Sequence, residues 1–187
     1  MTTVDRPGAG TVELRPVDSD TFRGLLRRQA STVTVVTTPG LHVGRRRPSL
    51  PPAGFTATSF TSVSLDPPLV SFCLGRESSS WPTVERAEHV AVHLLASGQQ
   101  EVARVFATSG IDRFAAHPGW ETGPFGVPLI ADALAVLLCR VVRRIEAGDH
   151  TLVLAEPLAL GAGEDGDPLV HHRGGYTTTL GAWPETW

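Results

Sequence analysis

The stretch "AGFTATSFTSVSLDPPLVSF", residues 53–72, carries the most informative pattern in this sequence. From Thr56 to Ser64, six of nine residues bear a hydroxyl group. The other three recur at every third position: Ala57, Phe60 and Val63. This spacing suits neither a flat strand nor a regular helix. It predicts a bent, extended segment with Phe60 and Val63 turned toward a core. Taken alone, its hydroxyl-rich side is more typical of a surface loop that binds nothing than of a ligand site.

The segments around this stretch read mostly as strands. β-branched or apolar runs predict strands at 31–38, 68–74 and 89–96, and two long strands at 133–149 and 150–163. "EAGD", residues 146–149, is a tight-turn sequence that predicts an antiparallel hairpin, and Pro157 belongs at an edge or a bulge. Two short segments flank Gly174-Gly175, and Trp120 to Pro128 reads as a loop.

Three short helices interrupt these strands. The first follows Asp18 or Ser19 as its cap, with Phe22, Leu25 and Leu26 on one face. The second follows the serines at 78–80, one of which supplies the cap, and the third runs from a Ser97 cap to near Gly110. Because no strand–helix–strand repeat is present, the prediction is a mainly β fold with short helices, a barrel or sandwich. Residues 1–17 are expected to form a flexible arm, and 18–187 a single domain.

The amino-acid composition excludes several kinds of ligand and catalytic mechanism. The net charge of −3 argues against nucleic-acid binding. The chain contains no lysine, which excludes Schiff-base catalysis and a lysine phosphate loop. Cys73 and Cys139 lie in apolar runs without CxxC spacing, which indicates buried free thiols in a reducing compartment. The longest apolar run is too short for a membrane span, and we expect a cytoplasmic location.

The order of the motifs resembles the flavin reductase family of two-component monooxygenases. Seven motifs carry the resemblance, which extends from Phe22 to Leu180 over some 85% of the chain. They are "GFTATSFTSVSLDPPLVSFCL", "SSSWPTV", "LASGQQEVARVFA", "DRF", "GVPLIADALAVLLCRV", "EAGDHTLVLAEP" and "PLVHHRGGYTTTL". Any one motif is a weak signal, but seven in family order are specific. The resemblance implies an FMN-binding split β-barrel, Greek-key-like, with flanking helices.

The resemblance also assigns a role to the hydroxyl-rich segment. In the family it wraps the flavin, so the implied contacts to FMN or FAD are Thr56, Ala57, Thr58, Ser59, Ser62 and Ser64. Backbone amides and short hydroxyls suit a ring edge of donors and acceptors and a polyol. The family loop over the flavin phosphate corresponds to Ser78, Ser79 and Ser80. This geometry serves a phosphate and simple helix capping equally well. Arg76 or Arg113 is a candidate for added positive charge.

Two further residues are implied near the ring. His150, in "GDH", corresponds to a histidine that lies where nicotinamide stacks on the flavin, and it can orient the carboxamide or hold a proton near neutral pH. Asp149 is expected to make the turn. Tyr176 falls where the family places a residue close to the flavin. We expect no metal site, although His171 and His172 are adjacent.

Two positions depart from the family pattern. His93 stands where the family usually has asparagine, so it must replace whatever contact that asparagine makes to the flavin or to a neighbouring strand. The segment from Leu41 to Pro52 is longer than expected, and its Arg45-Arg46-Arg47 run reads first as a solvated loop, with a phosphate, a nucleotide or a partner protein as the alternatives.

The implied function is an NAD(P)H-dependent flavin reductase, an NAD(P)H:flavin oxidoreductase that uses NADH or NADPH and passes reduced flavin to a separate oxygenase. A homodimer is implied as well. The alternatives are a split-barrel protein that binds or carries flavin without useful NAD(P)H turnover, and a split-barrel enzyme of another kind, such as a deazaflavin or pyridoxamine-phosphate enzyme. The last is disfavoured because such phosphate sites depend on lysine and arginine clusters, and lysine is absent.

Overall fold

A computed structural model of the chain describes residues 3–4, 12–14, 16–41 and 49–179. The Arg45-Arg46-Arg47 run and much of the expected N-terminal arm lie outside these residues. In the described part, every strand pairing is antiparallel. The predicted mainly β fold with short helices is therefore confirmed.

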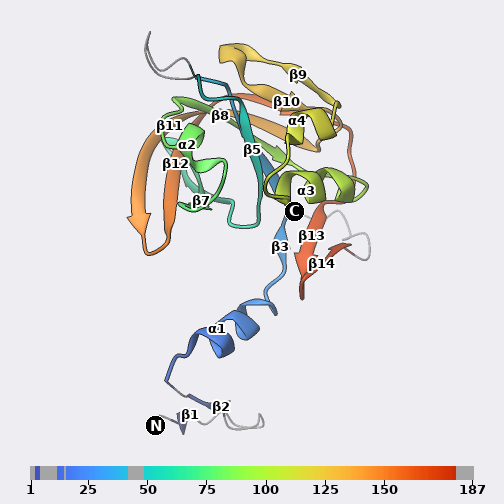
Figure 1. Cartoon of the computed structure of the whole chain (residues 1–187). Helices are drawn as coiled ribbons and strands as arrows, with labels where there is room; N and C mark the ends of the chain where they lie inside the picture. The colour runs from blue at the N-terminus through green and yellow to red at the C-terminus, as the bar shows by residue number, and fades with distance from the viewer. Residues whose placement is uncertain (1–2, 5–11, 15, 42–48, 180–187) are drawn as a thin grey trace.

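The main body is a seven-stranded sheet in the order β5-β4-β8-β11-β12-β7-β6 (Figure 1). Its strands are β4 (Thr34–Thr38), β5 (Ala53–Ala57), β6 (Thr61–Leu65), β7 (Pro68–Gly75), β8 (His89–Leu94), β11 (Ala135–Ala147) and β12 (His150–Ala162). The two edge strands, β5 and β6, are consecutive in the chain and are joined only by residues 58–60. The hydroxyl-rich stretch therefore links the two edges of the curled sheet, as a split barrel requires.

The remaining elements are short. A three-stranded sheet contains β3 (Ser31–Thr32), β13 (Leu169–His172) and β14 (Gly175–Thr178), and two-stranded pairs are formed by β1 (Thr3–Val4) with β2 (Val12–Glu13) and by β9 (Trp120–Thr122) with β10 (Pro128–Ile130). The helices are α1 (Ser19–Leu26), α2 (Trp81–Val84), α3 (Gln100–Ala107), α4 (Arg113–Ala116) and the 3-10 turn η1 (Pro124–Gly126). None of the described helices has the length and apolar character needed to cross a bilayer.

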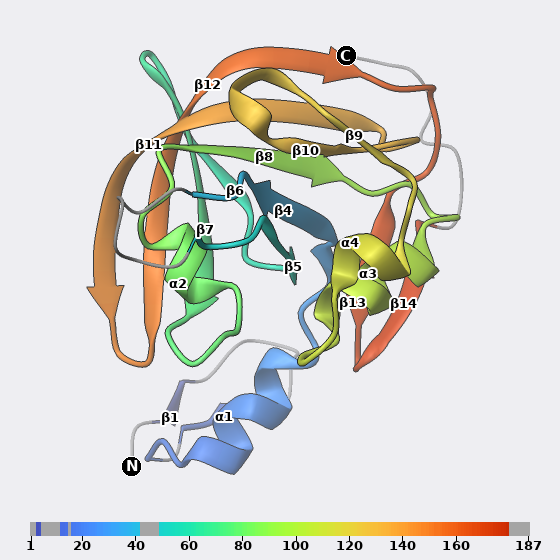
Figure 2. The ribbon, with the colours of Figure 1, turned by 45° about the horizontal axis from the view of Figure 1, so that its top comes forward.

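The long, curved β11–β12 hairpin lies within the seven-stranded sheet (Figure 2), and its turn is where the sequence predicts it. Ala147 pairs with His150, so Gly148 and Asp149 form a two-residue turn, and Gly148 adopts a φ of +64°. Such a left-handed backbone favours glycine, which explains the "GD" pair. Pro157 lies beside a break in register opposite Leu138 and Cys139, as expected for a proline in a strand.

Apolar side chains fill the interior of the curled sheet. Val36, Phe55, Phe72, Val92 and Val153 form its centre, and all are almost completely buried. A second cluster, which includes Val35, Leu95 and Phe106, lies between the sheet and α3. Gly54 allows this packing, because a Cβ there would lie 2.6 Å from the ring of Phe106. The α3 helix is thus held directly against β5.

Several local predictions need correction. The predicted strand 31–38 divides at Val33 between two sheets. The Trp120–Pro128 loop contains the β9–β10 hairpin, which the Gly123 amide closes by donating to the Val127 carbonyl oxygen at 2.9 Å. The α3 helix begins after Gln99, not Ser97, whose backbone amide bonds to Asp167 instead.

The expected burial pattern also needs correction at two residues. Val63 is 52% exposed, because it lies on the edge strand β6, whereas Phe60 packs against the core as predicted. Cys73 is only half-buried because it lies beside a surface hollow, whereas Cys139 is buried, and both thiols are free. Burial raises the pKa of the Cys139 thiol to about 12.

Candidate functional site

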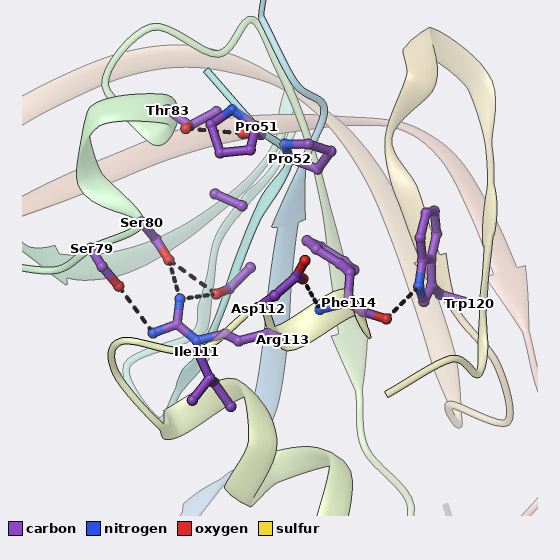
Figure 3. A pocket seen from close by; sticks show the side chains of 12 residues that line it. Pro51, Pro52, Ser79, Ser80, Thr83, Ile111, Asp112, Arg113, Phe114 and Trp120 are labelled. Atoms are coloured by element: carbon purple, nitrogen blue, oxygen red, sulfur yellow. Dashed lines mark hydrogen bonds between the residues drawn. The ribbon is translucent and has the colours of Figure 1, made fainter. Parts of the chain in front are cut away.

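Two hollows lie along β5 and carry most of the predicted site residues. The first, which we call the Arg113 hollow, has a volume of about 450 Å³ and extends from Ala53 and Gly54 to Ser79, Ser80 and Arg113 (Figure 3). The second, the His150 hollow, has a volume of about 260 Å³ and is lined by residues 55–59, 73–75 and His150. Because strand residues rise by about 3.3 Å each, Gly54 in the first hollow and Ala57 in the second lie about 10 Å apart along β5.

Arg113 is the centre of the first hollow. Its side chain is buried, and its guanidinium donates to the carbonyl oxygens of Thr108 at 2.9 Å and Gly54 at 3.0 Å. It also donates to the hydroxyl oxygens of Ser80 at 2.8 Å and Ser79 at 3.2 Å, as Figure 3 shows. Burial lowers the pKa of Arg113. Arginine nevertheless stays charged at physiological pH, so the hollow holds a fixed positive charge.

This charge has no carboxylate partner within 4 Å in the part of the chain that the structure describes. Asp112 is the nearest acidic residue in sequence, but its carboxylate caps α4 by accepting from the amides of Phe114 and Ala115. A buried cation without a counter-ion favours an anionic ligand. The Arg113 hollow therefore suits a phosphate.

Aromatic packing holds Arg113 in place. Phe114, the next residue, packs edge-on against Phe106 and Trp120 at centroid distances of 5.4 and 5.2 Å. The indole N–H of Trp120 donates to the carbonyl oxygen of Phe114 at 3.1 Å. The α4 helix is fixed between α3 and β9 by these contacts, and Arg113 with it.

The predicted serines behave differently from one another. Ser80 is buried and stands at the N-cap of α2, but its hydroxyl makes no cap bond and donates to the Gly54 carbonyl oxygen at 3.0 Å. The prediction of a serine side-chain cap is therefore wrong, because Gly54 is the acceptor that this buried hydroxyl reaches. Ser79 is exposed and aimed at Arg113, whereas Ser78 accepts from the Ser80 amide at 3.3 Å and lies outside the Arg113 hollow.

His150 lines the second hollow together with Thr56, Ala57, Thr58 and Ser59. Its Nδ1 lies 2.7 Å from Asp149 Oδ1, and this hydrogen bond lowers the pKa of Asp149. In neutral His150 the bond keeps the proton on Nδ1, which leaves Nε2 free to accept. The structure thus brings together the turn histidine and the hydroxyl-rich bend, which are more than 90 residues apart in the sequence.

Arg76 supports the turn that presents His150. Its guanidinium donates to the Gly148 carbonyl oxygen at 2.6 Å and lies 3.5 Å from Glu146, and its backbone amide donates to the Asp149 carbonyl oxygen at 3.0 Å. Of the two arginine candidates for a phosphate, Arg76 is thus engaged with the hairpin, and Arg113 remains.

Other predicted residues lie elsewhere or have their hydroxyls engaged. The Thr56 hydroxyl donates to Ala103 in α3 at 2.7 Å, and the Ser59 hydroxyl accepts from the Cys73 amide at 2.9 Å. Ser62 and Ser64 lie on β6 and line neither hollow. Tyr176 lies under Arg104, 5.8 Å from its guanidinium carbon, and edge-on to His171, also away from both hollows.

His93 occupies a structural position. It is fully buried, with Nδ1 2.9 Å from the Val35 carbonyl oxygen and Nε2 3.0 Å from the Ile130 amide. The neutral ring satisfies both groups by donating from Nδ1 and accepting at Nε2. Burial lowers its pKa to about 4. The sequence left open whether His93 contacts the flavin or a neighbouring strand. The structure shows the second: His93 bridges the strands β4 and β10.

Comparisons with known proteins identify the family. Residues 26–180 match the family described as "Flavin reductase like domain", and the chain belongs to it. It is 40% identical over 181 residues to an NADH:FMN oxidoreductase of Rhodococcus qingshengii, a match that covers 94% of this chain and 90% of that protein. It is 33% identical to the reductase subunit of a flavin-dependent monooxygenase of Rhodococcus jostii, over 91% of this chain and 83% of that one.

A solved structure shows the same fold. The NADH:FAD oxidoreductase of Streptomyces globisporus, in complex with NAD and FAD fragments, superposes with a TM-score of 0.78 at 34% identity. The match covers 93% of this chain and 99% of that one. The predicted split-barrel fold and the resemblance to flavin reductases are both confirmed.

Within the described residues, no three His, Cys, Asp or Glu side chains come together as metal ligands. His171 and His172 remain a pair on β13 without a third ligand. The candidate site thus offers cationic, hydroxyl and backbone groups, which suit an organic phosphate.

Proposed function

We propose that this chain is an NAD(P)H:flavin oxidoreductase that reduces FMN or FAD and supplies the reduced flavin to a separate oxygenase. The single observation that carries the proposal is the arrangement along β5, with the unpaired cation of Arg113 near one end and His150 with the hydroxyl-rich bend near the other. The names of the relatives, which include an NADH:FMN oxidoreductase and a monooxygenase reductase subunit, support it.

The residues present fit a flavin mononucleotide unit. Arg113, Ser79 and Ser80 would hold the phosphate, because the guanidinium is buried, charged and without a carboxylate partner. The backbone of residues 56–59 and the Thr58 hydroxyl would border the ring and polyol, since the Thr56 and Ser59 hydroxyls already bond to Ala103 and Cys73. Bound there, flavin would supply the redox chemistry, since its ring accepts a hydride from a reduced nicotinamide.

The chain itself would orient the nicotinamide and exclude water. His150 lines the hollow with Nε2 free, so it can donate to or accept from a carboxamide and can hold a proton that balances the hydride. Asp149 and Arg76 fix the position of this ring, because they hold the turn from both sides. Positioning two rings at close range is the main requirement of hydride transfer.

A spectroscopic assay tests the proposal. Purified protein, FMN and NADH, mixed in air, should consume NADH at a rate that depends on both flavin and protein. Binding of FMN without any oxidation of NADH or NADPH would instead favour the flavin-carrier alternative. Absence of both binding and turnover would reject the flavin site itself.

A homodimer is proposed as well. Phe22, Leu25 and Leu26 of α1 are each more than half exposed, although α1 is amphipathic. Burial of such a face against a second copy would remove apolar surface from water. Light scattering after gel filtration should give about twice the monomer mass of 19.9 kDa, and Leu25→Glu should shift it toward one chain.

We further propose a cytoplasmic location, where NADH and NADPH are formed. The free thiols of Cys73 and Cys139 support this location, because reducing compartments keep such thiols unpaired. Fractionation of cells that produce the full chain would test it.

A further inference from the structure

A third hollow borders the hydroxyl-rich bend on the side of α1. It has a volume of about 470 Å³, and its lining includes Arg23 and Arg27 of the α1 segment, Ser31, His171 of β13, and Thr58 and Ser59. We call it the Arg27 hollow. Thr58 and Ser59 line the His150 hollow as well. A ligand that begins at His150 can therefore continue across this bend into the Arg27 hollow.

The lining of the Arg27 hollow is basic and contains no carboxylate. Arg23 lies 3.5 Å from the exposed carboxylate of Asp20, whereas Arg27 has no ion pair within the described ranges. Two arginines and a histidine line one hollow together with the hydroxyl-bearing residues Ser31, Thr58 and Ser59. Arginine forks and hydroxyl donors are the groups that bind phosphate oxygens in proteins.

The β13–β14 turn holds Arg27 in place. The backbone amide of Arg173 donates to the Arg27 carbonyl oxygen at 3.0 Å. Gly174 adopts a φ of +83°, and a Cβ added there would lie 2.4 Å from Arg27 Nη2. The positive φ favours glycine at this turn, and the absence of a side chain there lets the Arg27 guanidinium lie close to it. These contacts fix Arg27 on a chain segment that makes few other contacts with the barrel (Figure 1).

We propose that the Arg27 hollow binds the pyrophosphate and adenosine half of a dinucleotide whose other half occupies the His150 hollow. The inference rests on the proposed function and extends it to the part of the ligand that does not react. The pyrophosphate supplies two negative charges for Arg23 and Arg27. This half belongs to NAD(P)H, because in FAD it would continue from the phosphate that we place at Arg113, and the second arm of the experiment checks this assignment.

The test compares Arg27→Gln with Arg28→Gln, a control that removes the same charge one residue further on, outside the hollow. With FMN as acceptor, Arg27→Gln should raise the KM for NADH about tenfold, the effect of losing one charge-assisted hydrogen bond. Turnover with reduced nicotinamide mononucleotide, which lacks the adenosine half, should not change. Arg28→Gln should match the unsubstituted protein in every assay.

The second arm replaces FMN by FAD. A higher KM for FAD in Arg27→Gln, with the KM values for NADH and FMN unchanged, would assign the adenosine half to FAD and overturn the proposal. Calorimetric titration with ADP gives a readout independent of turnover: the unsubstituted protein and Arg28→Gln should bind it, and Arg27→Gln should bind it about tenfold more weakly. Thermal unfolding of both variants checks that α1 and the turn remain folded.

The outcomes distinguish the two proposals. If the unsubstituted protein oxidises neither NADH nor NADPH with any flavin, the proposed function fails. If it does so, but Arg27→Gln changes neither dinucleotide use nor ADP binding, only the Arg27 hollow is rejected. An equal loss with reduced nicotinamide mononucleotide and NADH would also reject it, because the effect would then arise at the reacting half.

Discussion

Arg113 and Ser80 share one acceptor: the guanidinium donates to the Ser80 hydroxyl at 2.8 Å, and both groups donate to the Gly54 carbonyl oxygen at 3.0 Å. The three residues come from α4, the start of α2 and β5. Their hydrogen bonds fix a positive charge at one end of the β5 strand, and they lead directly to the first prediction.

Arg113→Gln should weaken FMN binding by about 10- to 100-fold, the effect expected from losing charge-assisted hydrogen bonds to a phosphate. Riboflavin, which lacks the phosphate, should bind the variant and the unsubstituted protein alike. Fluorescence titration with both flavins measures this difference. Arg104→Gln is the matched control, because Arg104 is exposed and lies outside the hollow. Equal losses for FMN and riboflavin would show that Arg113 acts only on the fold.

Substitution of the two neighbouring serines, Ser79 and Ser80, should have different effects on stability. Ser80→Ala leaves the Gly54 carbonyl oxygen and Arg113 each short of one partner in a buried environment, and should lower the free energy of unfolding by about 1–3 kcal/mol. Ser79→Ala removes one exposed hydroxyl and should be nearly silent in both stability and FMN affinity, since other donors remain. Urea unfolding of both variants tests the contrast, and equal effects would contradict it.

His150→Ala should reduce kcat/KM for NADH by about 10²-fold while FMN affinity changes little, because the residue is proposed to act on the nicotinamide. Stopped-flow reduction and fluorescence titration measure the two quantities separately. Asp149→Asn is the companion variant, since it removes the carboxylate that holds the proton on Nδ1 but keeps the turn. An equal loss of both quantities in His150→Ala, or no loss, would remove His150 from this role.

The buried His93 should make stability depend on pH. Its pKa is about 4 in the folded chain and near 6.5 when unfolded, so the unfolded state takes up the proton first as pH falls. Stability is therefore complete above about pH 6.5 and decreases as pH falls toward 4, by about 3 kcal/mol in total. Urea unfolding at a series of pH values tests this. His93→Asn, which removes the titrating group, should abolish that part of the pH dependence.

Thr151→Val should stabilise the protein. The Thr151 hydroxyl is buried on β12 and finds no hydrogen-bond partner among the residues that the structure describes. Valine keeps the branched shape that suits a strand and removes the cost of burying an unpaired hydroxyl, about 1–3 kcal/mol. Thermal unfolding should show a higher midpoint than in the unsubstituted chain. Val153→Thr, which places a hydroxyl at a buried apolar position of the same strand, should lower the midpoint of thermal unfolding.

Local sequence patterns were sufficient for much of this fold. β-branched runs marked β4 and β8, the "EAGD" turn marked the β11–β12 hairpin, and Asp18 caps α1 as its position predicts. Each of these features depends on neighbours within a few residues. Predictions failed where a distant partner intervened. The Ser80 hydroxyl bonds to Gly54, and Val63 is exposed because its strand lies at a sheet edge.

The residue types of the candidate site were evident in the sequence, but their grouping was not. The hydroxyl-rich bend, the three serines, Arg113 and His150 all stood out as separate signals. Only the tertiary structure divides them between two hollows, excludes Ser62 and Ser64, and adds Arg27 from an α1 segment that the sequence connects to neither. Strand pairing joins residues more than 90 positions apart, and whether a charge is buried without a partner depends on every element packed around it. Neither property is contained in a local pattern.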